Sequence, residues 1–168
     1  MIVRETKRLL LRELLASDAA FMLELLNSEG WIRYIGDRNV HTVDEAEKYL
    51  LNGAIKSYAV NGFGLWMIED RLKSAPVGIC GLIRREGLDD VDLGFALLPE
   101  YTGSGLAGEA AAASIQIARE MEPTRLVAIT TTDNHSSIRL LEKLGFVFDR
   151  IMSLPNETTI LNLFVLEL

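Results

Sequence analysis

Short apolar runs alternate along the chain with segments in which apolar residues recur every three or four positions. Seven runs rich in Leu, Ile, Val and Phe predict strands, at residues 6–14, 63–68, 77–83, 91–98, 126–131, 146–152 and 159–166. Four segments have helical spacing, and they begin near Ser17 or Asp18, Thr42 or Asp44, Leu106, and Asp133 or Asn134. This order of elements predicts a mixed α/β sheet in one domain that spans residues 1–168.

The stretch at residues 92–121 carries the strongest local signal for ligand binding. A strand ends at Pro99, a glycine-rich turn follows, and a helix begins whose apolar face is Leu106, Ala110, Ala113, Ile117 and Met121. The first amides of a helix have no internal partner, and glycines let the backbone approach an anion, so the pattern favours phosphate binding. The alternative is that the glycines serve only the turn and close packing.

Composition narrows the class of partner. The 168 residues are 49% hydrophobic and 24% charged, and the net charge is −7, which argues against nucleic acid and favours a cationic or amine-bearing partner. The single Cys80 excludes an intrachain disulfide and suits a reducing compartment, so we expect a cytoplasmic protein without a signal peptide or membrane span. His41 and His135 lie in unrelated segments, and no metal site is expected.

Two known phosphate-binding patterns compete for the glycine-rich turn. A P-loop needs Lys and then Ser or Thr after its last glycine, but Glu109 and Ala110 follow Gly108. A Rossmann dinucleotide site matches Gly103-x-Gly105-x-x-Gly108 literally, and Asp133 has the place of a ribose-binding acid. Against it, residues 99–102 intervene between the strand and the first glycine, and too little chain follows for a second mononucleotide-binding half.

A series of motifs covers nearly the whole chain in a characteristic order. These are KRLLLR at 7–12 with Asp18, VGICGL at 77–82, DLGFAL at 92–97, YTGSGLAGEA at 101–110, NHSS at 134–137 and EKLGF at 142–146. In this order and spacing they resemble the GCN5-related N-acetyltransferases (GNAT), in the branch that includes the enzymes acetylating the N-termini of ribosomal proteins. The resemblance implies a mostly antiparallel seven-stranded sheet with about four helices, in which strands 91–98 and 126–131 splay apart to hold acetyl-CoA.

The resemblance also implies which residues contact the CoA moiety. They are Phe95, Ala96, Leu97, Gly103, Ser104, Gly105, Leu106, Ala107, Gly108, Asn134 and Ser137. The chain departs from the family pattern at three places. Thr102 stands where Gln or Arg is usual, Ser104 stands where a basic residue is usual, and Leu140 and Leu141 occupy the neighbourhood of the tyrosine that many members use as general acid. The first two departures predict weaker CoA binding, although backbone amides can still hold the pyrophosphate.

Acyl transfer to an amine needs a neutral amine, a polarised carbonyl and a proton for the leaving thiolate. A backbone amide near residues 95–97 can polarise the thioester oxygen. The resemblance makes Asp92 the general-base candidate, because members of the branch often carry the longer glutamate at this position. The alternative is an exposed strand carboxylate, and His135 is a second candidate base. The resemblance makes Ser137 the proton-donor candidate, because the same position in the resembled branch faces the CoA sulfur; alternatively Ser137 and Asn134 only cap a helix.

The remaining candidates concern the acceptor. Trp31, Arg33 and Tyr34 lie in the segment that walls the acceptor pocket in the resembled family, with ordinary packing as the alternative. Cys80 lies in an apolar strand, which favours an inert buried thiol over a nucleophile. We therefore expect an acetyl-CoA-dependent N-acetyltransferase, a monomer or homodimer, that acts on a protein N-terminus or small-molecule amine by direct attack in a ternary complex. The alternatives are a non-catalytic acyl-CoA-binding module and a Rossmann-type protein.

Overall fold

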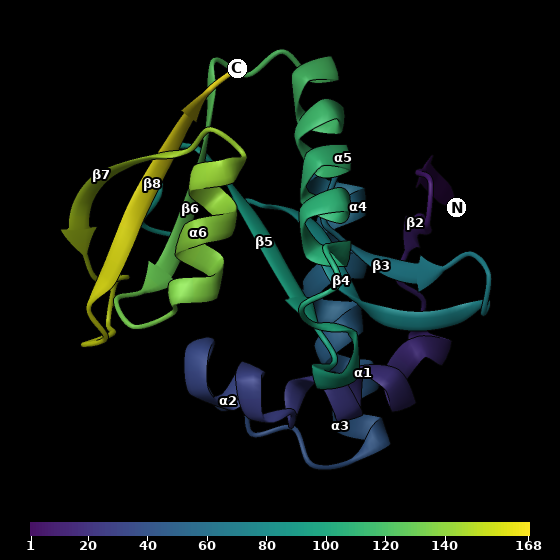
Figure 1. Ribbon diagram of the computed structural model, residues 1–168. Helices are drawn as coiled ribbons and strands as arrows, with labels where there is room; N and C mark the ends of the chain where they lie inside the picture. Colours follow the sequence, from purple (N-terminus) through teal and green to yellow (C-terminus); the bar gives the residue numbers. More distant parts are fainter.

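One eight-stranded sheet runs through the protein, in the spatial order β1-β2-β3-β4-β5-β6-β8-β7 (Figure 1). The computed structural model describes all 168 residues. Its strands are β1 (Ile2–Glu5), β2 (Leu9–Glu13), β3 (Leu65–Asp70), β4 (Ala75–Ile83), β5 (Val91–Leu97), β6 (Arg125–Thr131), β7 (Val147–Met152) and β8 (Leu161–Glu167). All neighbours pair antiparallel except β5 and β6. The prediction of seven strands missed β1, an edge strand of four residues that is ordered by pairing with β2.

The helices are α1 (Ala19–Leu26), α2 (Glu29–Tyr34), α3 (Val43–Leu50), α4 (Lys56–Asn61), α5 (Leu106–Glu120) and α6 (His135–Lys143). A π-helical turn at Leu51–Ile55 joins α3 to α4 in one continuous helix. Thr42 and Glu45 form a capping box at its start, and Gly62 ends it at φ +77°, a left-handed conformation that favours glycine. The one predicted helix over this region is therefore confirmed, whereas α2 is not among the four helices that the sequence predicted.

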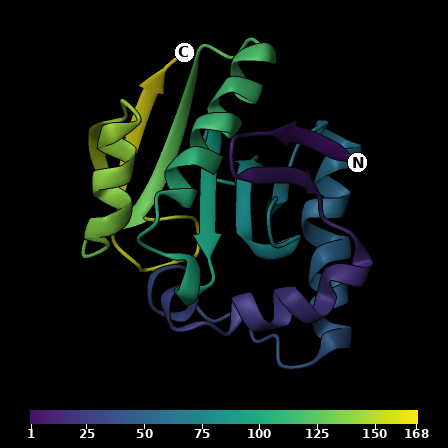
Figure 2. The same cartoon turned by 45° about the vertical axis from the view of Figure 1, so that its right-hand side comes forward.

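The centre of the sheet around β5 is covered on both faces, and this fixes which way the β5 side chains point (Figures 1 and 2). Leu93, Phe95 and Leu97 pack in the cluster that contains the α5 alanines. Ala96 packs in the cluster built from α1, α2 and α3. Because successive strand residues point to opposite faces, Asp92 lies on the same face as Ala96, toward the N-terminal helices. None of the helices is both long enough and apolar enough to cross a membrane.

The sheet splits between its two parallel strands. β5 and β6 pair only at Val91 with Leu126 and at Asp92 with Val127. From Leu93 onward β5 has no strand partner on this side, and Figure 1 shows the two strands diverging with α5 and α6 on either side of the gap. The predicted splay is confirmed. It leaves backbone groups of β5 free to bind a ligand that extends alongside the strand.

Candidate active site

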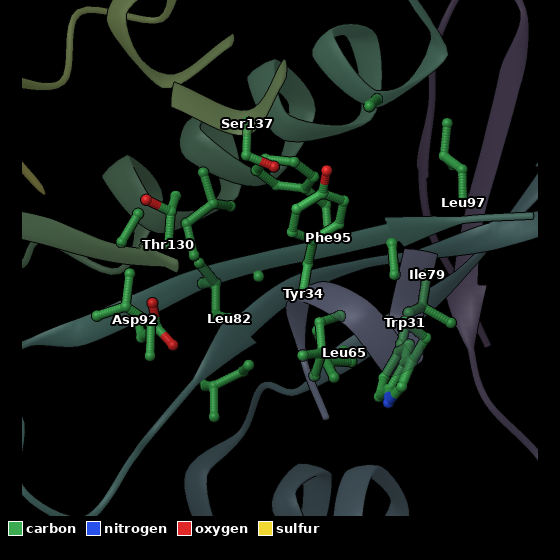
Figure 3. Close-up of a pocket in the computed structure, with 18 of the residues that line it drawn as sticks. Trp31, Tyr34, Leu65, Ile79, Leu82, Asp92, Phe95, Leu97, Thr130 and Ser137 are labelled. Carbon is green, nitrogen blue, oxygen red and sulfur yellow. The ribbon is translucent and has the colours of Figure 1, made fainter. Parts of the chain in front are cut away.

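A cleft of about 1280 Å³ opens where β5 and β6 diverge, and it is lined by residues of α2, α4, α5, α6 and the strand ends (Figure 3). Most of the side chains predicted from the sequence line it: Trp31, Tyr34, Asp92, Phe95, Ala96, Leu97, Gly103, Gly105, Leu106, Ala107, Gly108, Asn134 and Ser137. Two predicted residues, Arg33 and Ser104, lie outside its lining. The cleft thus joins residues from segments that are far apart in the sequence.

The glycine-rich turn presents a row of unused amides at one end of the cleft. The amides of residues 103–108 donate no hydrogen bond within the protein, and the first helical bond of α5 runs from Glu109 N to Gly105 O at 3.1 Å. Gly103 and Gly105 both have φ +80°, which a side chain would disfavour. Unpaired amides at the start of a fifteen-residue helix, in a turn without side-chain obstruction, fit an anionic group such as a pyrophosphate.

An arginine from the other end of the sequence supports this turn. Arg8 donates from Nη1 to Ser104 O at 2.8 Å and from Nε to Glu109 Oε2 at 2.6 Å. Burial alone would raise the pKa of Glu109, but hydrogen bonds from Thr6 and Arg8 outweigh it and hold this pKa below its usual value. Glu109 therefore stays ionised and fixes Arg8. The Nη2 atom of Arg8 would lie 3.4 Å from a Cβ placed on Gly105, so a guanidinium stands beside the turn that lacks its own basic residue.

Asp92 lies where the two parallel strands separate, and it is only 1% exposed. The alternative interpretation of an exposed strand carboxylate is therefore wrong. Arg85 Nε donates to its Oδ2 at 2.9 Å, while the buried Oδ1 has no partner within the protein. Burial raises the pKa of Asp92 to about 6, and the nearby Arg85 offsets this only in part. The result is a carboxylate that is ionised at neutral pH and still basic enough to accept a proton.

The beginning of α6 places a hydroxyl on the opposite wall. Asn134 caps this helix, since its Oδ1 accepts a hydrogen bond from Ser137 N at 3.3 Å. The capping geometry predicted for this pair is present, and it leaves the Ser137 hydroxyl without a partner within the protein. In Figure 3 the hydroxyl of Ser137 and the phenol oxygen of Tyr34 extend into the same part of the cleft, beside the ring of Phe95.

Helix α2 contacts the start of α6 through an ion pair. Arg33 forms an ion pair with Asp133 at 3.6 Å, just before α6, and its guanidinium stacks 4.9 Å from the ring centre of Tyr34. Trp31 is buried, and its Nε1 has no hydrogen-bond partner. Arg33 thus holds Tyr34 in place from outside the cleft, while Trp31 and Tyr34 form the wall itself.

Two further candidates lie away from this chemistry. Cys80 is fully buried, its Sγ is 3.3 Å from Ser114 Oγ, and burial raises the pKa of the thiol to about 12. It is therefore a protonated core residue rather than a nucleophile. His135 is exposed at the first position of α6 and does not line the cleft, which leaves Asp92 as the better placed base.

Comparison with known proteins identifies this arrangement. The family model described as "Acetyltransferase (GNAT) domain" matches residues 8–147. The chain belongs to the GNAT acetyltransferase family. The Bacillus subtilis (strain 168) protein named "Uncharacterized N-acetyltransferase YoaA" is 27% identical to it over 146 residues, which cover 86% of this chain and 82% of that protein.

Solved structures share the GNAT fold over the whole chain. An acetyltransferase from Agrobacterium tumefaciens str. C58 is 21% identical with a TM-score of 0.84, covering 100% of this chain and 95% of that one. RimL, described as a ribosomal L7/L12 alpha-N-protein acetyltransferase in complex with coenzyme A, is 17% identical with a TM-score of 0.84, covering 99% of this chain and 98% of that one. At these identities the likeness concerns the fold.

Proposed function

We propose that this GNAT acetyltransferase transfers the acetyl group of acetyl-CoA to a primary amine by direct attack. The observation that carries the proposal is one cleft that contains both an anion-binding helix start and a buried carboxylate with a pKa of about 6. A Rossmann-type protein is disfavoured, because β5 pairs with β6 at only two positions, whereas a Rossmann fold has a continuous parallel sheet. Protein N-termini remain among the proposed acceptors, since RimL carries that description.

The chain offers a complete set of contacts for the CoA moiety. The free amides of residues 103–108, with Arg8 beside them, would hold the pyrophosphate. Asn134 and the unpaired edge of β5 would contact the pantetheine arm. Arg8 is paired with Glu109, but its Nη2 group stands beside the turn and can donate to an anion, so the weaker binding expected from Thr102 and Ser104 is partly offset.

The chemical step assigns each group one role. Asp92, through Oδ1, accepts the proton that the amine loses as its nitrogen forms a bond to the acetyl carbon. A β5 amide at residues 95–97 polarises the carbonyl oxygen. The carbon–sulfur bond then breaks, and Ser137 protonates the leaving thiolate while Asn134 holds the start of α6. Tyr34, whose phenol extends to the same place, is the second hydroxyl available for that proton.

Thermal unfolding with ligands tests the binding half of the proposal. Acetyl-CoA at millimolar concentration should raise Tm in a concentration-dependent way, because a ligand that binds only the native state stabilises it. NAD at the same concentration is the control. A rise in Tm with NAD but not with acetyl-CoA would support a Rossmann-type dinucleotide site instead. A shift with acetyl-CoA but no amine-dependent release of CoA from any acceptor would instead favour the non-catalytic acyl-CoA-binding module.

Gly105→Val tests the turn as the phosphate cradle. The β-branched side chain should intrude on the anion site and restrict the backbone at φ +80°, so CoA affinity should fall by about tenfold or more. Gly62→Val is the matched control, since Gly62 also has positive φ with nothing within 4 Å of an added Cβ, but it ends α4 instead. Binding is measured by titration calorimetry. If the folded Gly105→Val protein bound CoA normally, the glycine-rich turn would not be the pyrophosphate site.

A further inference from the structure

The cleft is positively charged although the protein is acidic. The chain has a net charge of −7. Of the eight charged side chains that line the cleft, six are cations; the full set is Arg38, Lys56, Arg84, Arg85, Arg139, Lys143, Asp92 and Glu157. One of the two anions, Asp92, is already paired with Arg85. The lining therefore has the sign opposite to that of the whole molecule.

Most of these cations have no carboxylate partner in the protein. Of the twelve arginines in the sequence, eight form ion pairs, and the four that do not are Arg38, Arg84, Arg119 and Arg139. Three of these four line the cleft. Lys56 and Lys143, also in the lining, form no ion pair either. None of the five lysines forms an ion pair, so five of the nine unpaired arginines and lysines line the cleft, where a ligand would enter.

The unpaired cations of the cleft fall into two groups according to the helices and strands on which they lie. Arg139 and Lys143 are on α6, next to Leu140, which would lie 3.2 Å from a Cβ on Gly108 at the start of α5. They belong with the phosphate end of the cleft. The second group, the acceptor-side cations, consists of Arg38 after α2, Lys56 at the start of α4 and Arg84 after β4. Arg38 and Lys56 belong to the N-terminal helical region, and Arg84 directly precedes Arg85, the ion-pair partner of Asp92.

We propose that the acceptor is a primary amine that also carries a carboxylate, and that the acceptor-side cations bind this carboxylate. The inference rests on the proposed function and specifies its second substrate. A polyamine would meet three unpaired cations against the single free anion Glu157, whereas a carboxylate would be attracted. The net charge favours a cationic or amine-bearing partner; the inference keeps the amine and adds a carboxylate to it.

The same cations assist the chemistry. Neighbouring positive charge disfavours an ammonium ion and so lowers the pKa of a bound amine. A larger fraction of the acceptor is then neutral and nucleophilic near neutral pH, and Asp92 has to remove the proton only as the new bond forms. One electrostatic feature would therefore select the carboxylate and prepare the amine.

Matched acceptors that differ by one charge test the inference. The small-molecule arm compares γ-aminobutyrate with its amide, and the peptide arm compares Ser-Glu-Ala amide with Ser-Gln-Ala amide; spermidine serves as the cationic reference. Acceptor-dependent CoA release is followed by thiol detection. We expect the carboxylate member of at least one pair to have a kcat/KM about tenfold higher than its neutral partner, with the difference shrinking as salt is added. The arm that shows it identifies the source of the carboxylate.

Single-charge variants locate the effect. Lys56→Gln and Arg84→Gln should each reduce the preference for the carboxylate by about threefold or more and leave CoA affinity unchanged. Arg119→Gln is the matched control, because Arg119 is also exposed and unpaired but lies near the end of α5, outside the cleft. Equal rates within both pairs, or equal effects of all three variants, overturn the inference while acetyl transfer itself stands. If no acceptor releases CoA although acetyl-CoA binds, the proposed function fails and this inference fails with it.

Discussion

Asp92→Asn should lower kcat/KM at neutral pH by about 100-fold to 1000-fold, the range expected for loss of a positioned general base. The amide has nearly the same size as the carboxylate and still offers an oxygen to Arg85 Nε, so the local packing is retained. What it loses is the ability of the buried, unpartnered Oδ1 to accept a proton. The measurement is the initial rate at saturating acetyl-CoA with varied acceptor.

The pH profile distinguishes this role from a structural one. With a pKa of about 6, Asp92 is protonated and inactive as a base below that pH, so the rate should fall as pH drops through 6. A peptide α-amine titrates separately, near pH 8 in solution. Log kcat/KM should therefore rise with slope two below about pH 6, rise with slope one from there to about pH 8, and then level off. Asp92→Asn should keep only the amine's slope. An unchanged profile would assign the limb to His135 or to the acceptor.

Stability provides the control for this variant. The pKa of Asp92 is higher in the folded protein than its ordinary value near 4, so the native state binds this proton more tightly than the unfolded chain does. Stability from this group is thus greatest at low pH and declines as pH rises from about 4 to about 6. At pH 7 Asp92 is ionised, and the wild-type protein is destabilised by the full free energy of burying this charge. Asp92→Asn should therefore unfold at a Tm no lower than that of wild type. A rate loss with retained Tm then belongs to catalysis.

The sequence predicted the elements whose signals are local. The helix start at Thr42 and the glycine turn before α5 each depend on residues within a few positions of one another. The splay of β5 from β6 followed from the family resemblance rather than from spacing. β1 was missed because four residues with little apolar pattern become a strand only when β2 pairs with them.

The missed features of the site depend on long-range contacts. Arg8 reaches Ser104 across 96 positions of sequence, so nothing in the turn itself indicates a neighbouring guanidinium. Asp92 was open to interpretation as an exposed carboxylate because it alternates with apolar residues. That alternation indicates exposure only for a sheet with one solvated face, and β5 is a central strand covered on both faces.

Ser137→Ala should lower turnover by about 100-fold while CoA affinity stays close to wild type. A general acid stabilises only the transition state, so removing its hydroxyl should spare ground-state binding. Helix capping is unaffected, since the Ser137 contribution to the cap is its backbone amide. Asn134→Ala should behave differently: it removes the capping oxygen, raises the KM for acetyl-CoA and costs about 1 kcal/mol of unfolding free energy. Single-turnover kinetics and CoA titration separate the two effects.

Tyr34→Phe is the decisive companion to Ser137→Ala, because the two hydroxyls extend into the same part of the cleft. The substitution keeps the ring on which Arg33 stacks and removes only the phenol oxygen. If Ser137 protonates the thiolate, Tyr34→Phe should change turnover by less than about threefold. A fall of less than about threefold in Ser137→Ala, or a fall only in step with CoA affinity, would refute the role of Ser137. A large loss in Tyr34→Phe at unchanged affinity would then assign the proton to Tyr34 of α2 rather than to α6, the helix where the family's tyrosine normally stands.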